Sequence, residues 1–76
     1  MIATYKFFTI KSFPLQLIHT GQWKAHVAIT WERDGIVNSR SFPVGTDHPT
    51  QEEAHRHGIN FAQRIIDKKV PDLYLE

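Results

Sequence analysis

The chain has 76 residues, no cysteine and a formal net charge of +1, with 41% hydrophobic and 22% charged residues. This length allows one hydrophobic core, so we expect a single domain over residues 1–76. The composition is that of a globular protein and excludes a disordered chain. The absence of cysteine excludes disulfides, zinc–thiolate sites and thiol catalysis, and the near-neutral charge gives no general attraction to nucleic acid or acidic lipid.

The N-terminal segment is not typical of a targeting signal or a membrane span. It has no basic n-region, and its longest apolar run is Phe7 and Phe8. We therefore expect no membrane association and a location in a bacterial-type cytoplasm.

Three segments are typical of β-strands, at residues 4–11, 22–32 and 36–44. The first is rich in aromatic and β-branched residues and ends before Pro14, which cannot donate to a ladder. Residues 15–18 are a candidate fourth strand. The second segment has the period-2 alternation of a half-buried strand. Its apolar positions are Trp23, Ala25, Val27, Ile29 and Trp31.

The second and third strands are joined by Asp34 and Gly35, a strong signal for a two-residue hairpin turn. A type I′ turn there predicts four cross-strand pairs: Trp31 with Asn38, Ile29 with Arg40, Val27 with Phe42 and Ala25 with Val44. Asn38 and Arg40 then fall on the apolar face. Either they lie at the edge of what the helix covers, or a bulge shifts the register and turns Val37 inward.

A helix is predicted over residues 51–67. Thr50 and Glu53 form a capping box at its start, and Pro71 stops the helix or closely follows its end. Small or apolar residues recur at helical spacing, at Ala54, Gly58, Phe61, Ala62 and Ile65. We interpret Gly58 as a point of close approach between helix and sheet. The tail, residues 70–76, either frays or docks through Leu73 and Leu75.

These elements predict an α+β fold, with a three-stranded antiparallel sheet (four-stranded if residues 15–18 join it) and one C-terminal helix on one face (β-β-β-α). The predicted helix and the second strand have similar lengths, so one helix covers one sheet face. The other face is left to solvent or to a partner.

The sequence resembles a group of small, uncharacterised bacterial proteins with a domain of unknown function. The resemblance covers residues 5–71 and is carried by residues 21–29 (GQWKAHVAI), 50–54 (TQEEA) and 65–71 (IIDKKVP). It implies a β-β-β-α domain and no established activity. Thr50, Glu53 and Ala54 also give a looser similarity to antitoxins of the HicB type, which implies a regulatory partner.

No residue pattern points to catalysis or to a cofactor. His55 and His57 lie about 200° apart around a helix, so they cannot share a metal ion. Ser39 and Ser41 have no predictable base, and the four glycines form no phosphate-binding loop. We therefore expect no metal, no cofactor and no enzymatic activity.

The sequence favours a non-catalytic protein-interaction module that binds another protein, or itself, through the uncovered sheet face. Its candidate binding residues are Lys24, His26, Thr30, Ser39 and Ser41. The alternative is a weak nucleic-acid-binding or antitoxin-like regulatory protein. Trp23 and Trp31 are interpreted as capping the core, with protruding anchors as the second possibility.

Overall fold

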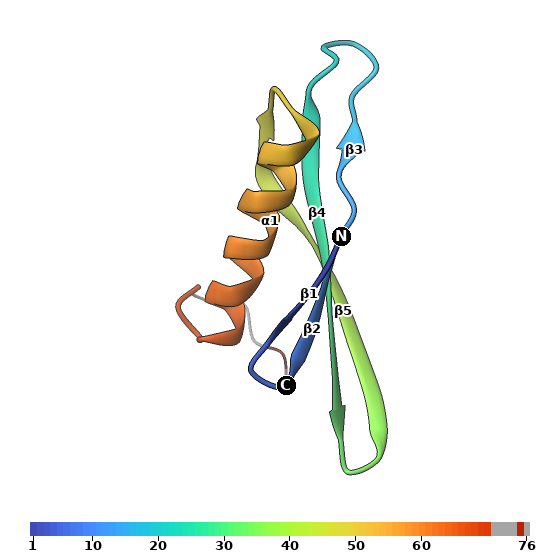
Figure 1. Cartoon of the computed structure of the whole chain (residues 1–76), viewed down its shortest axis with the longest axis vertical. Helices are drawn as coiled ribbons and strands as arrows, with labels where there is room; N and C mark the ends of the chain where they lie inside the picture. The colour runs from blue at the N-terminus through green and yellow to red at the C-terminus, as the bar shows by residue number, and fades with distance from the viewer. Residues whose placement is uncertain (71–74, 76) are drawn as a thin grey trace.

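The structure, a computed structural model, describes residues 1–70 and residue 75, apart from the side chain of Thr46. Five strands precede one helix. They are β1 (Ile2–Tyr5), β2 (Phe8–Ser12), β3 (Leu15–Gln16), β4 (Trp23–Arg33), β5 (Ile36–His48) and α1 (Gln51–Ile66). The fold is α+β, with an antiparallel sheet and a single C-terminal helix, as predicted (Figure 1). Within the described residues the sheet has five strands, whereas the sequence predicted three or four.

The long strand β4 is the centre of the sheet. One of its edges pairs with β5, and the other pairs first with β3 and then with β2, which also pairs with β1. Between β2 and β3 the backbone N–H of Phe13 donates to the carbonyl oxygen of His26 at 3.0 Å. The edge therefore stays close to β4 across Pro14, and residues 15–16 are the extra strand that the sequence left open.

The predicted first strand, residues 4–11, is wrong because the structure divides it into a hairpin. β1 and β2 pair from Ile2 with Lys11 to Tyr5 with Phe8, and the chain reverses at Lys6 and Phe7. Lys6 takes a φ of 55°, in the region that favours glycine. Neither turn residue is a typical turn former, which is why the local sequence gives no signal for a reversal.

The predicted register of the β4–β5 hairpin is confirmed near the turn, where Asn38, Arg40 and Phe42 pair as expected. A bulge is present, but it lies at the other end, between Lys24 and His26. Ala25 therefore faces the irregular segment 44–46 and not Val44 alone, and the third strand extends to His48, four residues past its predicted end.

Val37 therefore lies on the sheet face opposite the helix, where it is 66% exposed. Asn38 and Arg40 lie on the helix side, where the hairpin tip extends past the end of α1 (Figure 1). The guanidinium of Arg40 lies 5.1 Å from the centre of the Phe42 ring. The first of the two alternatives, that these residues lie at the edge of what the helix covers, is the correct one.

The core lies between α1 and one face of the sheet. Its buried apolar residues are Ile10, Ala25, Val27, Ile29, Phe42, Val44, Ala54, Ala62, Ile65 and Ile66. Gly58 is buried at the closest approach, with Val27, Ala25 and Ser12 beneath it. Trp23 and Trp31 are half-buried against this cluster, and the Trp31 ring lies 6.0 Å from that of Phe8. The tryptophans therefore cap the core.

Both ends of α1 are capped. At the start, the backbone N–H of Glu53 donates to Oγ1 of Thr50 at 3.1 Å, which confirms the predicted cap. At the end, the N–H groups of Lys69 and Lys68 donate to the carbonyls of Arg64 and Ile65, a Schellman motif with Lys68 at a φ of 61°. The helix ends before Pro71. Pro71 and Leu73 lie outside the described residues, whereas Leu75 packs against the core.

Candidate interaction surface

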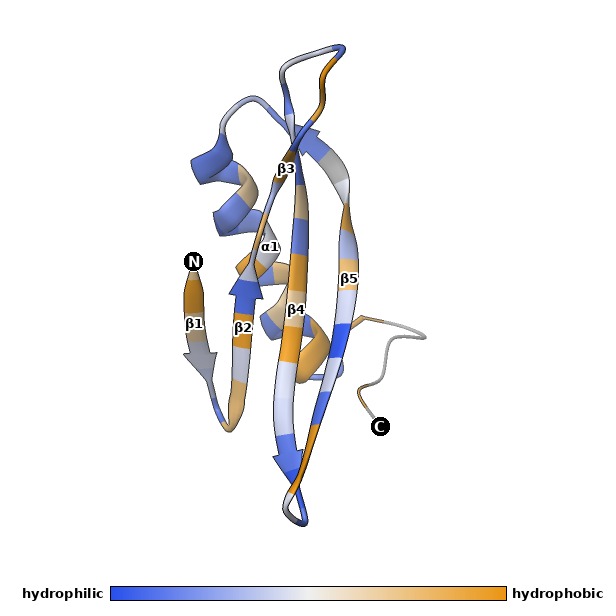
Figure 2. Cartoon of the chain, turned by 90° about the vertical axis from the view of Figure 1, so that its right-hand side faces the viewer, coloured by the Kyte–Doolittle hydropathy of each residue, from blue (hydrophilic) through white to orange (hydrophobic). Residues whose placement is uncertain are grey.

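The sheet face that α1 does not cover is called the open face here, and Figure 2 looks directly onto it. Cross-strand partners share a face, so the strand registers assign its members. They are Ile2, Thr4, Thr9, Lys11, Phe13, Leu15, Lys24, His26, Ala28, Thr30, Glu32, Val37, Ser39, Ser41, Pro43 and Asp47.

All five predicted binding residues lie on the open face. Lys24, His26 and Thr30 are half-buried along β4, and Ser39 and Ser41 are exposed on β5. The hydroxyl of Thr30 donates to Oγ of its cross-strand partner Ser39 at 3.3 Å. The structure thus brings these residues onto one surface, because they occupy alternate positions of two paired strands.

His26 is held in place by Phe13, which stacks on it with ring centroids 5.4 Å apart and an interplanar angle of 29°. Its Nδ1 atom is buried and has no hydrogen-bond partner among the described residues. The sequence indicated only that the first strand ends before Pro14, and it gave Phe13 no role of its own. The backbone hydrogen bond from Phe13 to His26 keeps residue 13 paired with β4 although the strand ends at Ser12. This pairing places the Phe13 ring on the open face.

The sequence did not identify the apolar residues of the open face. Four of its large apolar side chains are exposed: Ile2 (68%), Phe13 (36%), Leu15 (54%) and Val37 (66%). Across the strands, Lys11 lies between Ile2 and Ala28. Leu15 pairs with Lys24 near the start of β4, and Val37 pairs with Glu32 near its end. The available signal was the alternation of residues 11, 13 and 15, which continues through the break at Pro14.

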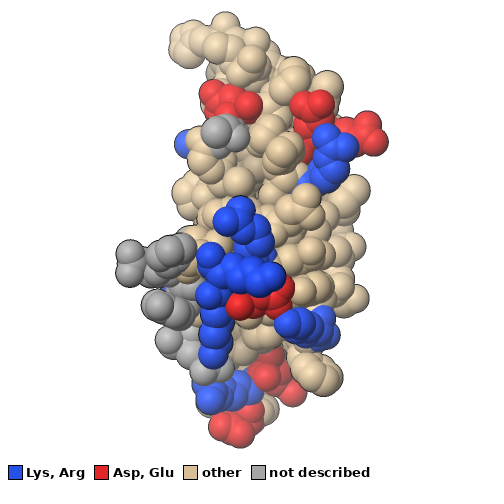
Figure 3. All heavy atoms as spheres, turned by 90° about the vertical axis from the view of Figure 1, so that its left-hand side faces the viewer, with Lys and Arg blue, Asp and Glu red and all other residues tan. Residues whose placement is uncertain are grey.

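The charges of the open face are mixed. Lys24 and Asp47 are direct cross-strand partners, and Lys11 and Glu32 lie further along the sheet. On the helix side, by contrast, Lys and Arg side chains gather into a patch (Figure 3). A cleft of about 620 Å³ lies there, and Arg64 and Lys69 are among its lining residues, with Asp67 and Val44.

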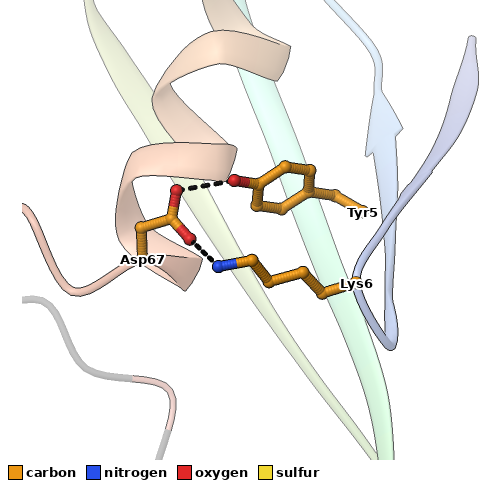
Figure 4. Close-up of polar contacts among 3 residues, drawn as sticks. All are labelled: Tyr5, Lys6 and Asp67. Carbon is orange, nitrogen blue, oxygen red and sulfur yellow. Dashed lines mark hydrogen bonds and ion pairs between the residues drawn. The ribbon is translucent and has the colours of Figure 1, made fainter.

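Asp67, at the end of α1, fastens the β1–β2 turn to the helix (Figure 4). Its carboxylate accepts a hydrogen bond from the Tyr5 hydroxyl at 2.6 Å and forms an ion pair with Lys6. The bonds from Lys6 and Tyr5 hold the pKa of Asp67 below its ordinary value, and the same contacts raise the pKa values of Tyr5 and Lys6. This contact explains how a turn without typical turn residues is held.

The histidines of α1 point to different surroundings. His55 Nδ1 is hydrogen-bonded to Oγ of buried Ser12 at 2.7 Å, and His57 stacks on His48 with ring centroids 4.4 Å apart. Among the described residues, no group of three or more His, Cys, Asp or Glu side chains could hold a metal ion. His48 is buried, and its Nε2 has no hydrogen-bond partner among the described residues.

A hydrogen-bonded serine and histidine are the usual start of a nucleophile–base pair. Here, however, Ser12 is 2% exposed, and its Oγ lies 3.7 Å from where a Cβ on Gly58 would be. An external substrate cannot reach a hydroxyl beneath the helix. The pair therefore joins α1 to β2, and sequence reasoning missed it because residues 12 and 55 are related only by the tertiary structure.

The fold and this surface together define a small α+β domain with one sheet face packed and one open. The chain belongs to the family described as Domain of unknown function (DUF6566), whose model matches residues 1–74. The resemblance to a family of unknown function is therefore confirmed. No curated protein and no solved structure matches the chain. The described part of the chain contains no helix with the length and apolar character needed to cross a membrane.

Proposed function

We propose that this domain is a non-catalytic interaction module that binds another protein through the open face of its sheet. The observation that carries the proposal is the arrangement of exposed apolar side chains around a centre of small ones. Ile2, Leu15 and Val37 are more than half exposed, and Ala28 and Ser41 pair at the centre. These side chains are spread over one sheet face, where a single partner that lies across the sheet can cover all of them.

The small residues at the centre allow close approach of a partner. Ala28 has Lys11 on one side and Ser41 on the other, and Thr30 is bonded to Ser39. The short side chains of Ala28, Ser39 and Ser41 leave this part of the sheet surface accessible to a flat or extended segment. The apolar residues further out then cover the partner on several sides, so an introduced long side chain at the centre is expected to block binding.

The charge distribution favours protein over nucleic acid as the partner. Nucleic-acid surfaces require a basic face, but Asp47 lies directly beside Lys24 and Glu32 lies on the same strand. The basic patch of the molecule lies on the helix side (Figure 3). The open face itself has mixed charges and exposed apolar side chains, and these are best complemented by a protein surface that also has mixed charges and apolar side chains.

Site-specific photo-crosslinking tests the proposal in the cells that naturally express the chain. A photoreactive residue at Ser41 samples the open face, and the same residue at Asn60 samples the exposed outer side of α1. We expect a discrete adduct with a different protein from position 41 only, and we expect Ala28→Arg to abolish that adduct. Equal adducts from positions 41 and 60, or none from either, would count against the proposal.

The identity of the adduct separates the alternatives. Recovery of nucleic acid crosslinked to position 41 would show that the open face binds nucleic acid and would contradict the proposed protein partner. Recovery of a protein encoded next to this chain, toxic when expressed alone, would make the module an antitoxin-like regulator. Circular dichroism of Ala28→Arg must show a folded domain, so that the loss of the adduct reflects lost binding and not unfolding.

A further inference from the structure

The outer edge of β5 carries an inference that is independent of the open face. β5 has 13 residues and pairs with β4 on one side. Within residues 1–70 and residue 75, no strand pairs with its other side. A long strand edge with free N–H and C=O groups is a template for pairing with another chain.

The turn geometry determines which backbone groups of β5 face outward. Asp34 and Gly35 have φ values of 54° and 79°, so both are positive as a type I′ turn requires. In a two-residue hairpin the flanking pair, Arg33 and Ile36, is hydrogen-bonded, and bonded and non-bonded pairs alternate from there. The N–H and C=O groups of Val37, Ser39 and Ser41 therefore point away from β4.

Pro43 supports this assignment. It pairs with His26 and falls at the next outward position after Ser41. A proline there costs no hydrogen bond to β4, because its missing N–H would have pointed outward. It also ends the row of outward donors on one side. On the other side, the row ends at the Asp34–Gly35 turn.

We propose that this edge pairs with the same edge of a second copy of the chain, antiparallel and about a two-fold axis at Ser39. Ser39 then faces Ser39 of the second copy, and Val37 faces its Ser41, each pair exchanging both N–H···O=C bonds. The outward-facing residues Val37, Ser39 and Ser41 are symmetric about Ser39. Gly35 and Pro43, which end this row, are equally far from Ser39 along the chain. The edge is thus self-complementary in length and register.

The side chains are compatible with this register. Asn38 faces Arg40 of the second copy, so the two arginines do not oppose each other directly. Ile36, which is 65% exposed, faces Phe42 of the second copy and gains an apolar neighbour. The open faces of the two copies then lie side by side on one continuous sheet, and both stay free for the proposed partner.

Single-cysteine crosslinking tests the register, because the natural chain has no cysteine. In a hydrogen-bonded antiparallel pair the Cα atoms lie about 5.5 Å apart, within the range that a disulfide spans. We expect Ser39→Cys to form a disulfide-linked dimer under mild oxidation. Ser41→Cys is the matched control, since it is exposed on the same strand and face but lies opposite Val37. Equal crosslinking at both positions, or none at position 39, overturns the proposal.

Sedimentation equilibrium tests the association itself. We expect the natural chain to reach twice its 8.8 kDa mass as concentration rises, and Ser39→Pro to stay monomeric and folded, because its lost N–H faces outward. Ala28→Arg should leave the dimer intact. A strictly monomeric natural chain overturns the proposal. So does a dimer that survives Ser39→Pro, or one that Ala28→Arg abolishes, which would instead assign self-association to the open face.

Discussion

Gly58 of α1 and Val27 of β4 lie so close together that a Cβ at position 58 would come within 2.9 Å of Val27 Cγ1. Val27 is fully buried at the centre of the sheet and is branched at its Cβ, so its methyl group cannot easily move aside. A glycine in the middle of a helix is ordinarily a weakness. Here it determines how closely the helix approaches the sheet.

Gly58→Ala should destabilise the domain although it improves helix propensity. The propensity gain is about 1 kcal/mol, whereas overpacking a core costs about 1–3 kcal/mol, so we expect a net loss of up to about 2 kcal/mol. Urea unfolding measures the change. In a Val27→Ala background the same substitution should cost less or become favourable. A stabilised Gly58→Ala single variant would contradict the close contact.

Val27→Asp should unfold the domain, because it places an unpaired carboxylate in the core beneath α1. Ser41→Asp is the matched control, since Ser41 is exposed on the open face of the neighbouring strand. Circular dichroism should show a cooperative thermal transition for Ser41→Asp and none for Val27→Asp. A folded Val27→Asp protein would mean that the two faces of the sheet are assigned the wrong way round.

Lys68→Gly should stabilise the domain. Lys68 has a φ of 61° in the Schellman motif that ends α1, a conformation that costs a non-glycine residue about 1–2 kcal/mol. Glycine removes this cost but gives the unfolded chain more freedom, so we expect a net gain of about 0.5–1 kcal/mol in urea unfolding. The adjacent control Lys69→Gly relieves no positive φ and should give no gain. An equal gain from both variants would contradict the explanation.

His55 should make stability fall under mildly acidic conditions. Burial, followed by the charge of the N-terminus, lowers the pKa of His55 below its ordinary value. The unfolded chain therefore takes up the proton first, and the free energy of unfolding should decrease as the pH falls from about 7 to about 5. Glutamine at position 55 does not titrate, so His55→Gln should make this decrease smaller. Identical pH profiles for the natural chain and His55→Gln would contradict the prediction.

Asp67 should make the free energy of unfolding depend on pH in a more acidic range than His55 does. Its pKa is lowered in the folded chain, mainly by the bonds from Lys6 and Tyr5, so its contribution is present above about pH 4 and is lost as the pH falls through the lowered value. Asp67→Asn should therefore be less stable than the natural chain at neutral pH, and the difference should shrink toward pH 3. Asp47→Asn, which leaves the Tyr5 and Lys6 contacts intact, is the control. A difference that stays constant with pH would argue against the ion pair.

Some features were predictable because neighbouring residues decide them. The Asp34–Gly35 turn follows from two residues that accept a positive φ, and it determines the register as far as Phe42. The start of α1 follows from the cap of Thr50 on Glu53. The alternation from Trp23 to Trp31 identified the packed face of β4, and by the same period of two it placed Lys24, His26 and Thr30 on the open face.

Other features depend on contacts between distant parts of the chain. The reversal at Lys6 has no local signal and is held by Asp67, which is 61 residues away. The Ser12–His55 bond and the stacking of His48 on His57 likewise join segments that no sequence period relates. Phe13 reaches the open face because its N–H stays bonded to His26 across the break at Pro14.

The sequence by itself determined the class of fold, the packed face of β4, the central hairpin and the limits of the helix, because turns, caps and periodicity act over a few residues. Only the tertiary structure decided the division of the first strand, the position of the bulge and the apolar residues that surround the open face. These depend on which distant backbone and side-chain groups meet, and a local pattern carries no information about that.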